Sequence, residues 1–452
     1  MQTPPTDSPP GAPRWDRSDR IVAVVVALAA LLHLYRVDSA PPGFFDDEAA
    51  IAAQAICVAQ SGHELFGARW PAFAPLIGDG LVTPVTLYVS AAWTWVFGTS
   101  IFAFRLLANV MALVGAAGVA YGGRTARERL WLGALVLTSP WLFSVSRMFM
   151  DPVFGFAALG WMFGLYRRER WAAFGVASAL AAMTYPPLRV QVALTWAVLF
   201  VVDRAGRRAR PWLSGWARAA VCAAVAATPM WLALSDPAYR ARGGSLAIWN
   251  QNFMEAHGLT FTPTAANLVG LGQIYVDNLR LFLTPSFLLW DGDANLRHGV
   301  GVGVLAWAEV VAIAWIGGAR LMRQPTPSAH ATLRGLLLVL ASVTGAALTH
   351  EGLPHALRSI GATAALAWLV ADVVTQAGPR ARAALTAALV VGASTFAWVH
   401  LSRAPQNGPW FQADVVKAAA LGDPLPADTP RPARDYYDLT SGRTRCRADD
   451  PR

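Results

Sequence analysis

Long apolar stretches recur along nearly the whole chain and constrain its fold more than any other feature. Roughly ten or more of them follow one another, each of about 15 to 20 mostly apolar residues and therefore long enough to cross a hydrocarbon core as a helix. Apolar residues make up 55% of the 452 and charged residues only 14%, a balance that a soluble protein of this length could hardly keep in solution. We therefore predict an all-α polytopic membrane protein.

The distribution of positive charge indicates orientation in a membrane rather than nucleic-acid binding. The formal net charge is +9, but the arginines cluster in short loops between apolar stretches, as is typical of cytoplasmic loops. The first cluster places the N-terminus in the cytoplasm, and the others reach the same side only if the segment from Thr83 to Gly98 does not cross. We expect that segment to lie at the interface as a short amphipathic helix. The clusters are Arg14, Arg17 and Arg20, then 122–129, 167–170 and 203–210.

This arrangement predicts about eleven transmembrane helices. The expected spans are 21–37, 102–121, 130–146, 153–166, 171–184, 188–202, 214–233, 301–319, 332–349, 356–374 and 383–401. Two large loops, near 38–101 and 235–300, then lie outside and carry interfacial helices. We expect a cytoplasmic tail (1–20), one membrane domain (21–402) and a short extracytoplasmic tail (403–452) with too little apolar content for a sizeable domain.

The cysteines and the N-terminus carry little functional signal. Cys57, Cys222 and Cys446 lie far apart without C-x-x-C spacing, which predicts neither a zinc site nor a disulfide framework, so we interpret them as ordinary small residues. The apolar run from Ile21 has no A-x-A-like cleavage site after it. We therefore expect a retained helix rather than a signal peptide.

Nearly all the unusual polar residues fall on the outer face of this topology. They are Asp46, Asp47 and Glu48 in the first outer loop, Arg147 and Asp151 in SRMFMDP, Tyr185 and Arg189 in TYPPLR, Arg297 and His298 in GDANLRH, and His355 and Arg358 in HEGLPHALR. Positive charge on this side runs against the topological bias, and an anionic ligand would account for it. An anion held at the membrane surface, with carboxylates nearby to accept a proton, suggests group transfer from a lipid phosphate.

Each of these residues also has a structural explanation. Asp46 could cap a helix that begins at Asp47, since carboxylates in a first turn are stabilised by up to about 1 kcal/mol each, although a cap requires only one. Asp151 followed by Pro152 is an ordinary helix start. Arg147 could pair with Asp151 at the interface, and the histidines are individually more often structural than catalytic.

Several motifs in this outer face resemble those of a known superfamily. PPGFFDDEA followed by GHELFG is similar to the first outer loop of the GT-C glycosyltransferases, in the branch of protein O-mannosyltransferases and the aminoarabinose transferases of lipid A. Within that branch the chain resembles bacterial membrane proteins loosely called dolichyl-phosphate-mannose-protein mannosyltransferase-like. The likeness extends from about residue 21 to 402 and includes FGTSIFAFRL, SRMFMD, TPSFLLWDGDANLRH and PHALR.

The resemblance implies a GT-C-like fold and a glycosyltransferase that uses a polyprenyl-phosphate sugar. Its active site would face outward from the bacterial plasma (inner) membrane, and its acceptor would be a hydroxyl or amine of a protein, lipid or glycan. The acidic pair of the family's first loop matches Asp47 and Glu48, and its next outer-loop aspartate matches Asp151, whereas Asp46 has no fixed counterpart. Relatives usually open the interfacial helix with a basic residue before x-P-P-L. The corresponding sequence here is LVTPVTLY, which lacks the basic residue. The donor or acceptor contact that relatives make with that residue is therefore not predicted for this chain.

The expected reaction is attack of an acceptor on the anomeric carbon, which expels polyprenyl phosphate. Asp47 is the candidate general base, while Glu48 and Asp151 tune its pKa or share a divalent cation with it. No cofactor is required by the sequence, although a divalent cation fits these three acids. Arginines suit the departing phosphate. The predicted substrate-binding residues are Asp46, Arg147, Tyr185, Arg189, Arg297, His298, His355 and Arg358.

Other classes of protein remain as alternatives at this stage. A transporter would carry ionisable groups near the membrane midplane and two related halves, whereas here the acids lie at helix ends on one side. A lipid-linked acyl or phosphoryl transferase would need a nucleophilic Ser or Cys beside a base, which the signature loops lack. A non-catalytic relative that only binds glycolipid is a further alternative. The sequence identifies neither the sugar nor the acceptor.

Overall fold

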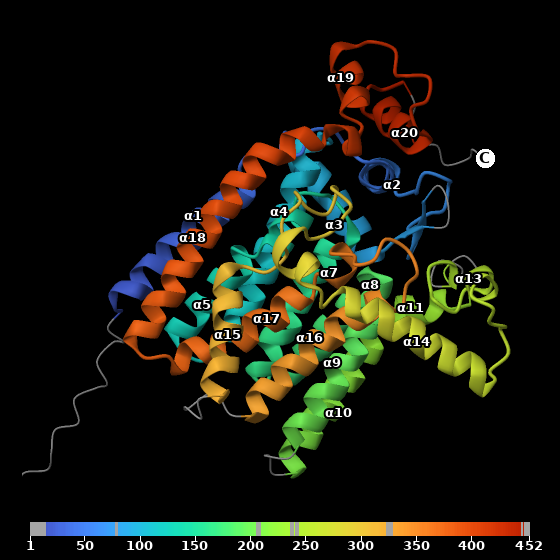
Figure 1. The fold of residues 1–452 in the computed structure, drawn as a ribbon. Coiled ribbons are helices and arrows are strands. Elements are labelled where there is room, and N and C mark those ends of the chain that lie inside the picture. The colour runs from blue at the N-terminus through green and yellow to red at the C-terminus, as the bar shows by residue number, and fades with distance from the viewer. Residues whose placement is uncertain are drawn as a thin grey trace, which may run out of the picture.

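The computed structural model describes residues 15–76, 80–204, 209–235, 239, 244–321, 329–443 and 446. Most of the predicted cytoplasmic tail, including Arg14, and the centre of the arginine tract 203–210 lie outside these residues. The described chain is almost wholly helical (Figure 1). Its one sheet, within the described residues, pairs the short strands β1 (Ala74–Pro75) and β2 (Leu81–Val82) in antiparallel register.

The helices form mainly in the apolar stretches, and several of them begin at a capping side chain. They are α1 (Arg17–Leu34), α2 (Asp46–Ser61), α3 (Pro84–Phe97), α4 (Ile101–Tyr121), α5 (Ala126–Leu137), α6 (Pro140–Ser146), α7 (Asp151–Arg167), α8 (Trp171–Thr184), α9 (Pro186–Arg204), α10 (Ala209–Ala226), α11 (Thr228–Ala233), α13 (Gln251–Ala256), α14 (Ala265–Leu281), η1 (Ser286–Trp290), α15 (Trp307–Leu321), α16 (Ala329–Ala347), η2 (Leu357–Ser359), α17 (Ala362–Gln376), α18 (Pro379–Arg403), η3 (Ala404–Phe411), α19 (Ala413–Leu421) and α20 (Arg431–Thr440). Ser100 and Thr125, for example, cap α4 and α5 with their hydroxyl oxygens. Each predicted span overlaps at least one helix.

Arginines from several inter-helix loops meet at one end of the bundle, which we call the arginine end. Arg127 at the start of α5 binds Asp19 at the start of α1, with a nitrogen-to-oxygen distance of 2.7 Å. Arg382 at the start of α18 reaches Asp16 at 3.3 Å, and Arg167 at the end of α7 pairs with Glu128. Three of the segments that were predicted to share one side of the membrane, near 14–20, 122–129 and 167–170, therefore lie together.

The segment predicted to lie at the interface forms α3, and its position relative to the membrane stays a prediction. α1 begins at the arginine end, and α4 ends there, since Arg168 Nε donates to the Tyr121 carbonyl at 2.9 Å. The chain between α1 and α4 thus leaves and re-enters the bundle at the end opposite the arginine end, toward which α2 and α3 lie (Figure 1).

Three helices of the described chain are long and apolar enough to cross a membrane by themselves. They are Ile101–Tyr121, Ala329–Ala347 and Pro379–Phe411, and five shorter apolar helices accompany them. These findings support an integral membrane protein. The predicted total of about eleven spans stays a prediction.

Close packing of α4 against α7 depends on glycine. A Cβ atom on Gly160 of α7 would collide with the carbonyl of Gly115 in α4, and one on Gly164 would collide with that of Gly118. Small residues let membrane helices approach closely enough for their backbones to touch. This contact fixes α7, whose first residue, Asp151, belongs to the site described below.

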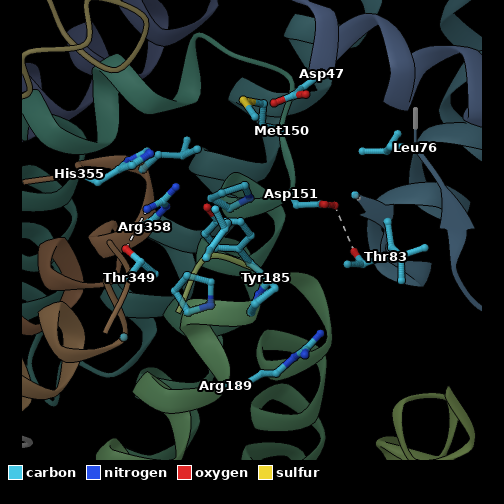
Figure 2. A pocket seen from close by; sticks show the side chains of 18 of the residues that line it. Asp47, Leu76, Thr83, Met150, Asp151, Tyr185, Arg189, Thr349, His355 and Arg358 are labelled. Atoms are coloured by element: carbon cyan, nitrogen blue, oxygen red, sulfur yellow. Dashed lines mark hydrogen bonds between the residues drawn. The ribbon is translucent and has the colours of Figure 1, made fainter. Parts of the chain in front are cut away.

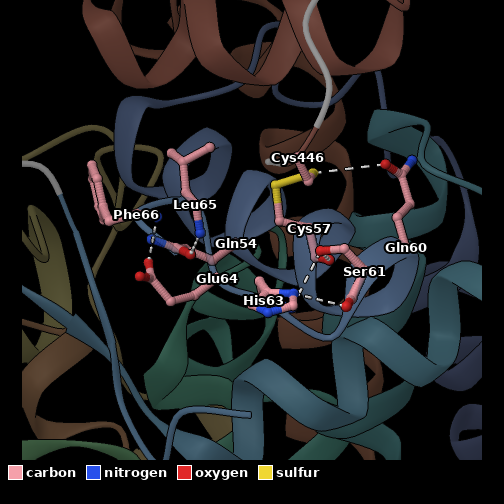
Figure 3. The surroundings of a disulfide bond; sticks show 9 residues. All are labelled: Gln54, Cys57, Gln60, Ser61, His63, Glu64, Leu65, Phe66 and Cys446. Carbon is pink, nitrogen blue, oxygen red and sulfur yellow. Dashed lines mark hydrogen bonds between the residues drawn. A yellow bond between two sulfur atoms is a disulfide. The ribbon is translucent and has the colours of Figure 1, made fainter. Parts of the chain in front are cut away.

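A disulfide joins α2 to the C-terminal tail and corrects the sequence prediction. Cys57 in α2 is bonded to Cys446 across a sequence separation of 389 residues (Figure 3). Two of the three cysteines are therefore not ordinary small residues, and only Cys222 is free. Further contacts hold the tail in place, because Tyr436 in α20 donates to the Thr99 carbonyl at 2.8 Å. Although short, the tail packs against α2 rather than standing apart (Figure 1).

Candidate active site

One cavity of about 510 Å³ lies at the end of the bundle opposite the arginine end. α7 connects the two, since Asp151 at its start lines the cavity while Arg167 at its finish belongs to the arginine end. The volume falls within the range of about 300 to 1,000 Å³ that is usual for small-molecule sites. Eight residues predicted from the sequence line this cavity: Asp47, Asp151, Tyr185, Arg189, Arg297, His298, His355 and Arg358. Figure 2 shows several of them pointing inward from separate elements.

Two carboxylates, Asp47 and Asp151, face this cavity from different helices. Asp47 is the second residue of α2 and the most accessible of the three consecutive acids. Asp151 begins α7, ahead of the predicted span 153–166, and accepts a hydrogen bond from Thr83 Oγ1 at 3.1 Å. Thr83 is in turn the N-cap residue of α3, so the start of α3 helps to position this acid.

The environment of Asp151 favours its protonated form. Burial raises the pKa of Asp151 to about 7, and the nearby charge of Asp47 adds to the rise, while hydrogen bonds from two threonines oppose it. Asp47 sits in the first turn of α2, where the helix dipole favours a negative charge. Asp151 therefore keeps its proton to a higher pH than an ordinary carboxyl does, and it shares one cavity with Asp47.

Three arginines line the same cavity and hold no carboxylate partner within ion-pair distance among the described residues. Arg297 lies over the ring of Phe45, with 3.9 Å from Cζ to the ring centroid, and Arg189 lies over Tyr239 at 4.7 Å. Arg358 donates to Thr349 Oγ1 at 2.8 Å. Burial lowers the pKa of Arg297, but Asp47 and neighbouring acids oppose this. These guanidinium groups are positioned to receive an anion.

The two predicted histidines stack against each other in one wall. The rings of His298 and His355 have centroids 4.3 Å apart. His298 Nδ1 lies 2.9 Å from an oxygen of Asp293, a residue of the GDANLRH motif that was not among the predicted site residues. Burial, together with the positive charges of Arg358 and Arg297, lowers the pKa of His355 well below its ordinary value, so this imidazole is neutral.

Glu48, predicted to be catalytic, does not line the cavity. It is fully buried and receives both arms of Arg105 from α4, at 3.0 and 2.9 Å. It also accepts the backbone N–H groups of Phe45 at 3.0 Å and Phe149 at 2.8 Å. The carboxylate thereby connects α2, α4 and the loop that leads to Asp151, which assigns it a structural role.

Arg147 and Asp46 also lie outside the cavity lining. Arg147 donates to the Tyr35 and Leu32 carbonyls at 2.6 and 2.7 Å, so its charge satisfies the end of α1 rather than a ligand. It does not form the ion pair with Asp151 that its spacing allowed. Asp46 accepts a hydrogen bond of 2.6 Å from Gln412 in the tail, and burial raises its pKa.

The predicted three-acid cation site is therefore not assembled. Hard cations such as Mg²⁺ take oxygen ligands, several of them from carboxylates. Asp47 and Asp151 line the cavity, but the oxygens of Glu48 are used by Arg105 and by two backbone N–H groups. At most two of the three acids could share a cation.

The cavity also contains residues that the sequence did not single out. Thr83, Tyr239 and Thr349 line it beside the predicted residues. They carried no signal, because a threonine or tyrosine in an outer loop is unremarkable in composition. Arg105, which lies outside the cavity lining, did carry a sequence signal, because an arginine inside the apolar stretch 102–121 requires a partner such as Glu48.

Comparisons with known proteins identify the fold. No protein-family model matches the sequence, and no curated protein matches it. A crystal structure of ArnT from Cupriavidus metallidurans bound to undecaprenyl phosphate is similar, with a TM-score of 0.59 and 12% identity over 92% of this chain and 84% of that one. An oligosaccharyltransferase from Archaeoglobus fulgidus, tethered to an acceptor peptide containing the NVT sequon, has a TM-score of 0.51 and 14% identity over 92% of this chain. This chain spans 58% of that protein.

Both of these structures have the GT-C fold of membrane glycosyltransferases. The described chain is mainly helical and matches them over nearly its whole length, which confirms the predicted GT-C-like fold class. Identities this low establish the fold alone. The predicted branch within the superfamily stays a prediction.

Proposed function

We propose that the protein is a glycosyltransferase that moves a sugar from a polyprenyl-phosphate donor to an acceptor hydroxyl or amine. The observation that carries the proposal is the convergence of two carboxylates and three arginines on one cavity. The fold supports it, since a similar structure, that of ArnT, is bound to undecaprenyl phosphate. Neither the acceptor nor the sugar follows from the geometry.

The arginines would bind the donor phosphate and stabilise it as it leaves. Arg297, Arg358 and Arg189 come from separate segments and line the cavity together. A departing phosphate gains negative charge in the transition state, and preorganised cationic donors stabilise that charge most when they are already in place. The hydrogen bonds of Arg358 and the ring beneath Arg297 hold these two side chains before any ligand binds.

Asp47 would accept the proton of the acceptor. The acceptor oxygen or nitrogen forms a bond to the anomeric carbon, the bond from that carbon to the phosphate oxygen breaks, and its electron pair leaves with polyprenyl phosphate. The acceptor's proton passes to the Asp47 carboxylate. Asp47 suits this role better than its neighbours because it lines the cavity, whereas Glu48 is engaged with Arg105.

The proposal places the cavity on the extracytoplasmic side of a bacterial plasma membrane. Two observations support this placement. The disulfide between Cys57 and Cys446 ties α2, which begins at the cavity, to the tail, and disulfides persist in oxidising compartments. The arginine end lies opposite, as expected for cytoplasmic loops.

A direct test is donor turnover by the purified protein in lipid nanodiscs. The protein is incubated with a panel of polyprenyl-phosphate sugars, and released polyprenyl phosphate is measured. We expect turnover of at least one donor and a loss of about 10²-fold or more in kcat/KM for Arg297→Gln. Arg280→Gln, which removes an exposed arginine on α14, is the matched control and should turn over normally.

The same experiment separates the alternatives. Tight donor binding without any turnover across the panel would indicate a protein that only binds glycolipid. Uptake of an intact donor or sugar into sealed vesicles, without cleavage, would indicate a transporter. Either result would overturn the proposed function.

A further inference from the structure

Asp293, His298 and His355 form a cluster of metal-ligand side chains in one wall of the cavity. One nitrogen or oxygen from each lies within 4.8 Å of the others. The Asp293 Oδ2 atom is 2.9 Å from His298 Nδ1 and 3.9 Å from His355 Nδ1. All three residues are buried, with exposed fractions of 4%, 6% and 9%. The acids that we assign to the reaction, Asp47 and Asp151, belong to other elements.

One atom of this cluster has no hydrogen-bond partner. His355 Nδ1 is buried and makes no hydrogen bond within the described part of the chain, although it is directed toward the Asp293 carboxylate. A buried imidazole nitrogen without a partner is unfavourable, because it has lost its hydrogen bond to water and has not formed one with the protein. A cation between His355 and Asp293 would satisfy it.

The carboxylate of Asp293 is held in position by the backbone. Its Oδ1 accepts the N–H of Asn295 at 2.9 Å, and its Oδ2 accepts the N–H of Ala356 at 2.8 Å. The second contact ties the loop that carries His298 to the loop that carries His355. Such outer contacts orient metal ligands and are a regular part of protein metal sites.

We propose that Asp293, His298 and His355 bind one divalent transition-metal ion of the zinc class. Two imidazoles and one carboxylate are a ligand set that zinc takes in open sites, where water or substrate occupies the fourth position. Ligand atoms around a tetrahedral zinc with bonds of about 2.0 to 2.2 Å lie roughly 3.3 to 3.5 Å apart. The observed separations lie on both sides of that value, so small side-chain rotations suffice.

Protons and nearby charges affect how tightly the ion would bind. Metal ligation needs neutral imidazoles. A proton on His298 Nδ1 would move to Nε2 when Nδ1 binds the ion. Arg297 and Arg358 lie close enough to act on His355 electrostatically, and their charge opposes a cation. We therefore expect weaker binding than in a closed four-ligand site.

The fourth position would face the cavity, since His298 and His355 both line it. Water would occupy this position in the free protein. A phosphate oxygen of the donor would replace that water when the donor binds. This replacement rests on the proposed function, whereas metal binding itself does not.

The test is metal binding by the full chain, purified without an affinity tag that could itself bind metal. The protein in nanodiscs is stripped with a chelator, loaded with Zn²⁺ or Co²⁺ and dialysed, and bound metal is measured by mass spectrometry. We expect about one ion per chain, together with the visible absorption of tetrahedral Co²⁺. His355→Gln and Asp293→Asn should each lose both signals.

His350→Gln provides the matched control, because His350 contacts the Ser245 carbonyl and is not part of the cluster. This variant should bind metal as the unmodified protein does. Should either cluster variant fail to fold, His298→Gln serves in its place. An unmodified chain without metal, or cluster variants that keep it, would overturn the proposal.

Donor turnover measured on the same samples keeps the two proposals distinguishable. Turnover without metal binding would refute the metal site and leave the proposed function intact. Metal binding without turnover of any donor would support the metal site and refute the proposed function.

Discussion

Glu48 and Arg105 form a two-armed ion pair in which neither side chain has any exposed surface. The pair joins the first turn of α2 to α4 and also receives the backbone N–H of Phe149, two residues before Asp151. Because Asp47 precedes Glu48 directly, the same pair holds the candidate base at the cavity. Glu48, which the family resemblance marks as functional, therefore supports the site by holding Asp47 in position.

Replacement of Glu48 by Gln should destabilise the protein. The change leaves Arg105 buried without its counter-charge, and breaking a buried pair in this way typically costs about 3 to 5 kcal/mol. We expect a clearly lower midpoint of thermal unfolding in detergent, whereas Glu255→Gln on the exposed face of α13 should leave it unchanged. A Glu48→Gln protein that is fully stable but inactive would instead indicate a catalytic role for this residue.

The three consecutive acids illustrate what the sequence could and could not predict. Composition, the long apolar stretches and the distribution of arginines predicted helices, their order and a functional outer loop. On a helix, however, successive residues point about 100° apart, so neighbouring acids face different surroundings. Asp46 contacts the tail, Asp47 lines the cavity and Glu48 enters the core. The rotation of α2 is set by its packing, which local sequence does not encode.

Contacts between distant segments could not be predicted from the sequence either. Cys57 and Cys446 gave no pairing signal, because two cysteines far apart are compatible with many arrangements. Arg147 and Arg297 looked equivalent as lone outer arginines, yet the first is used by carbonyls of α1 while the second lines the cavity. Asp293 lies in the motif GDANLRH, but only the fold brings it close to His355.

Loss of the disulfide should loosen the tail from α2. Cys446→Ser removes a crosslink that typically contributes about 2 to 4 kcal/mol, and the crosslink here joins distant parts of the chain. We expect a lower unfolding midpoint for Cys446→Ser and the same decrease for the unmodified protein under reductant. Cys222→Ser, which removes the free cysteine, should have no such effect. An unfolding midpoint insensitive to reductant would show that the bond does not contribute.

Opposite sides of the membrane should label differently in cells. In a Cys222→Ser background, Arg124→Cys introduces a thiol at an exposed position of the arginine end, and Lys417→Cys introduces one in α19 of the tail. An impermeant thiol reagent added outside should label Lys417→Cys and spare Arg124→Cys until the membrane is permeabilised. Labelling of Arg124→Cys in intact cells would reverse the proposed orientation.

Transfer should respond to pH near neutrality through Asp151. The pKa of Asp151 is raised to about 7, mainly by burial, so this group is neutral below that value and ionised above it. Its ionisation adds negative charge near Asp47 and makes that carboxylate a stronger base. The transfer rate should therefore rise as pH increases through about 7. In Asp151→Asn this rise should disappear, and an unchanged pH profile in that variant would exclude Asp151 as its source.

The most direct test of the account is single-turnover sugar transfer by Asp47→Asn, with an accepted donor and acceptor bound at saturation. The change removes the proton acceptor and keeps the side-chain shape, so we expect the chemical step to slow by about 10² to 10⁴-fold with donor affinity little changed. Asp277→Asn, an exposed acid on α14, should react at the unmodified rate. A transfer rate in Asp47→Asn equal to that of the unmodified protein would contradict the assignment of Asp47 as the base of this site.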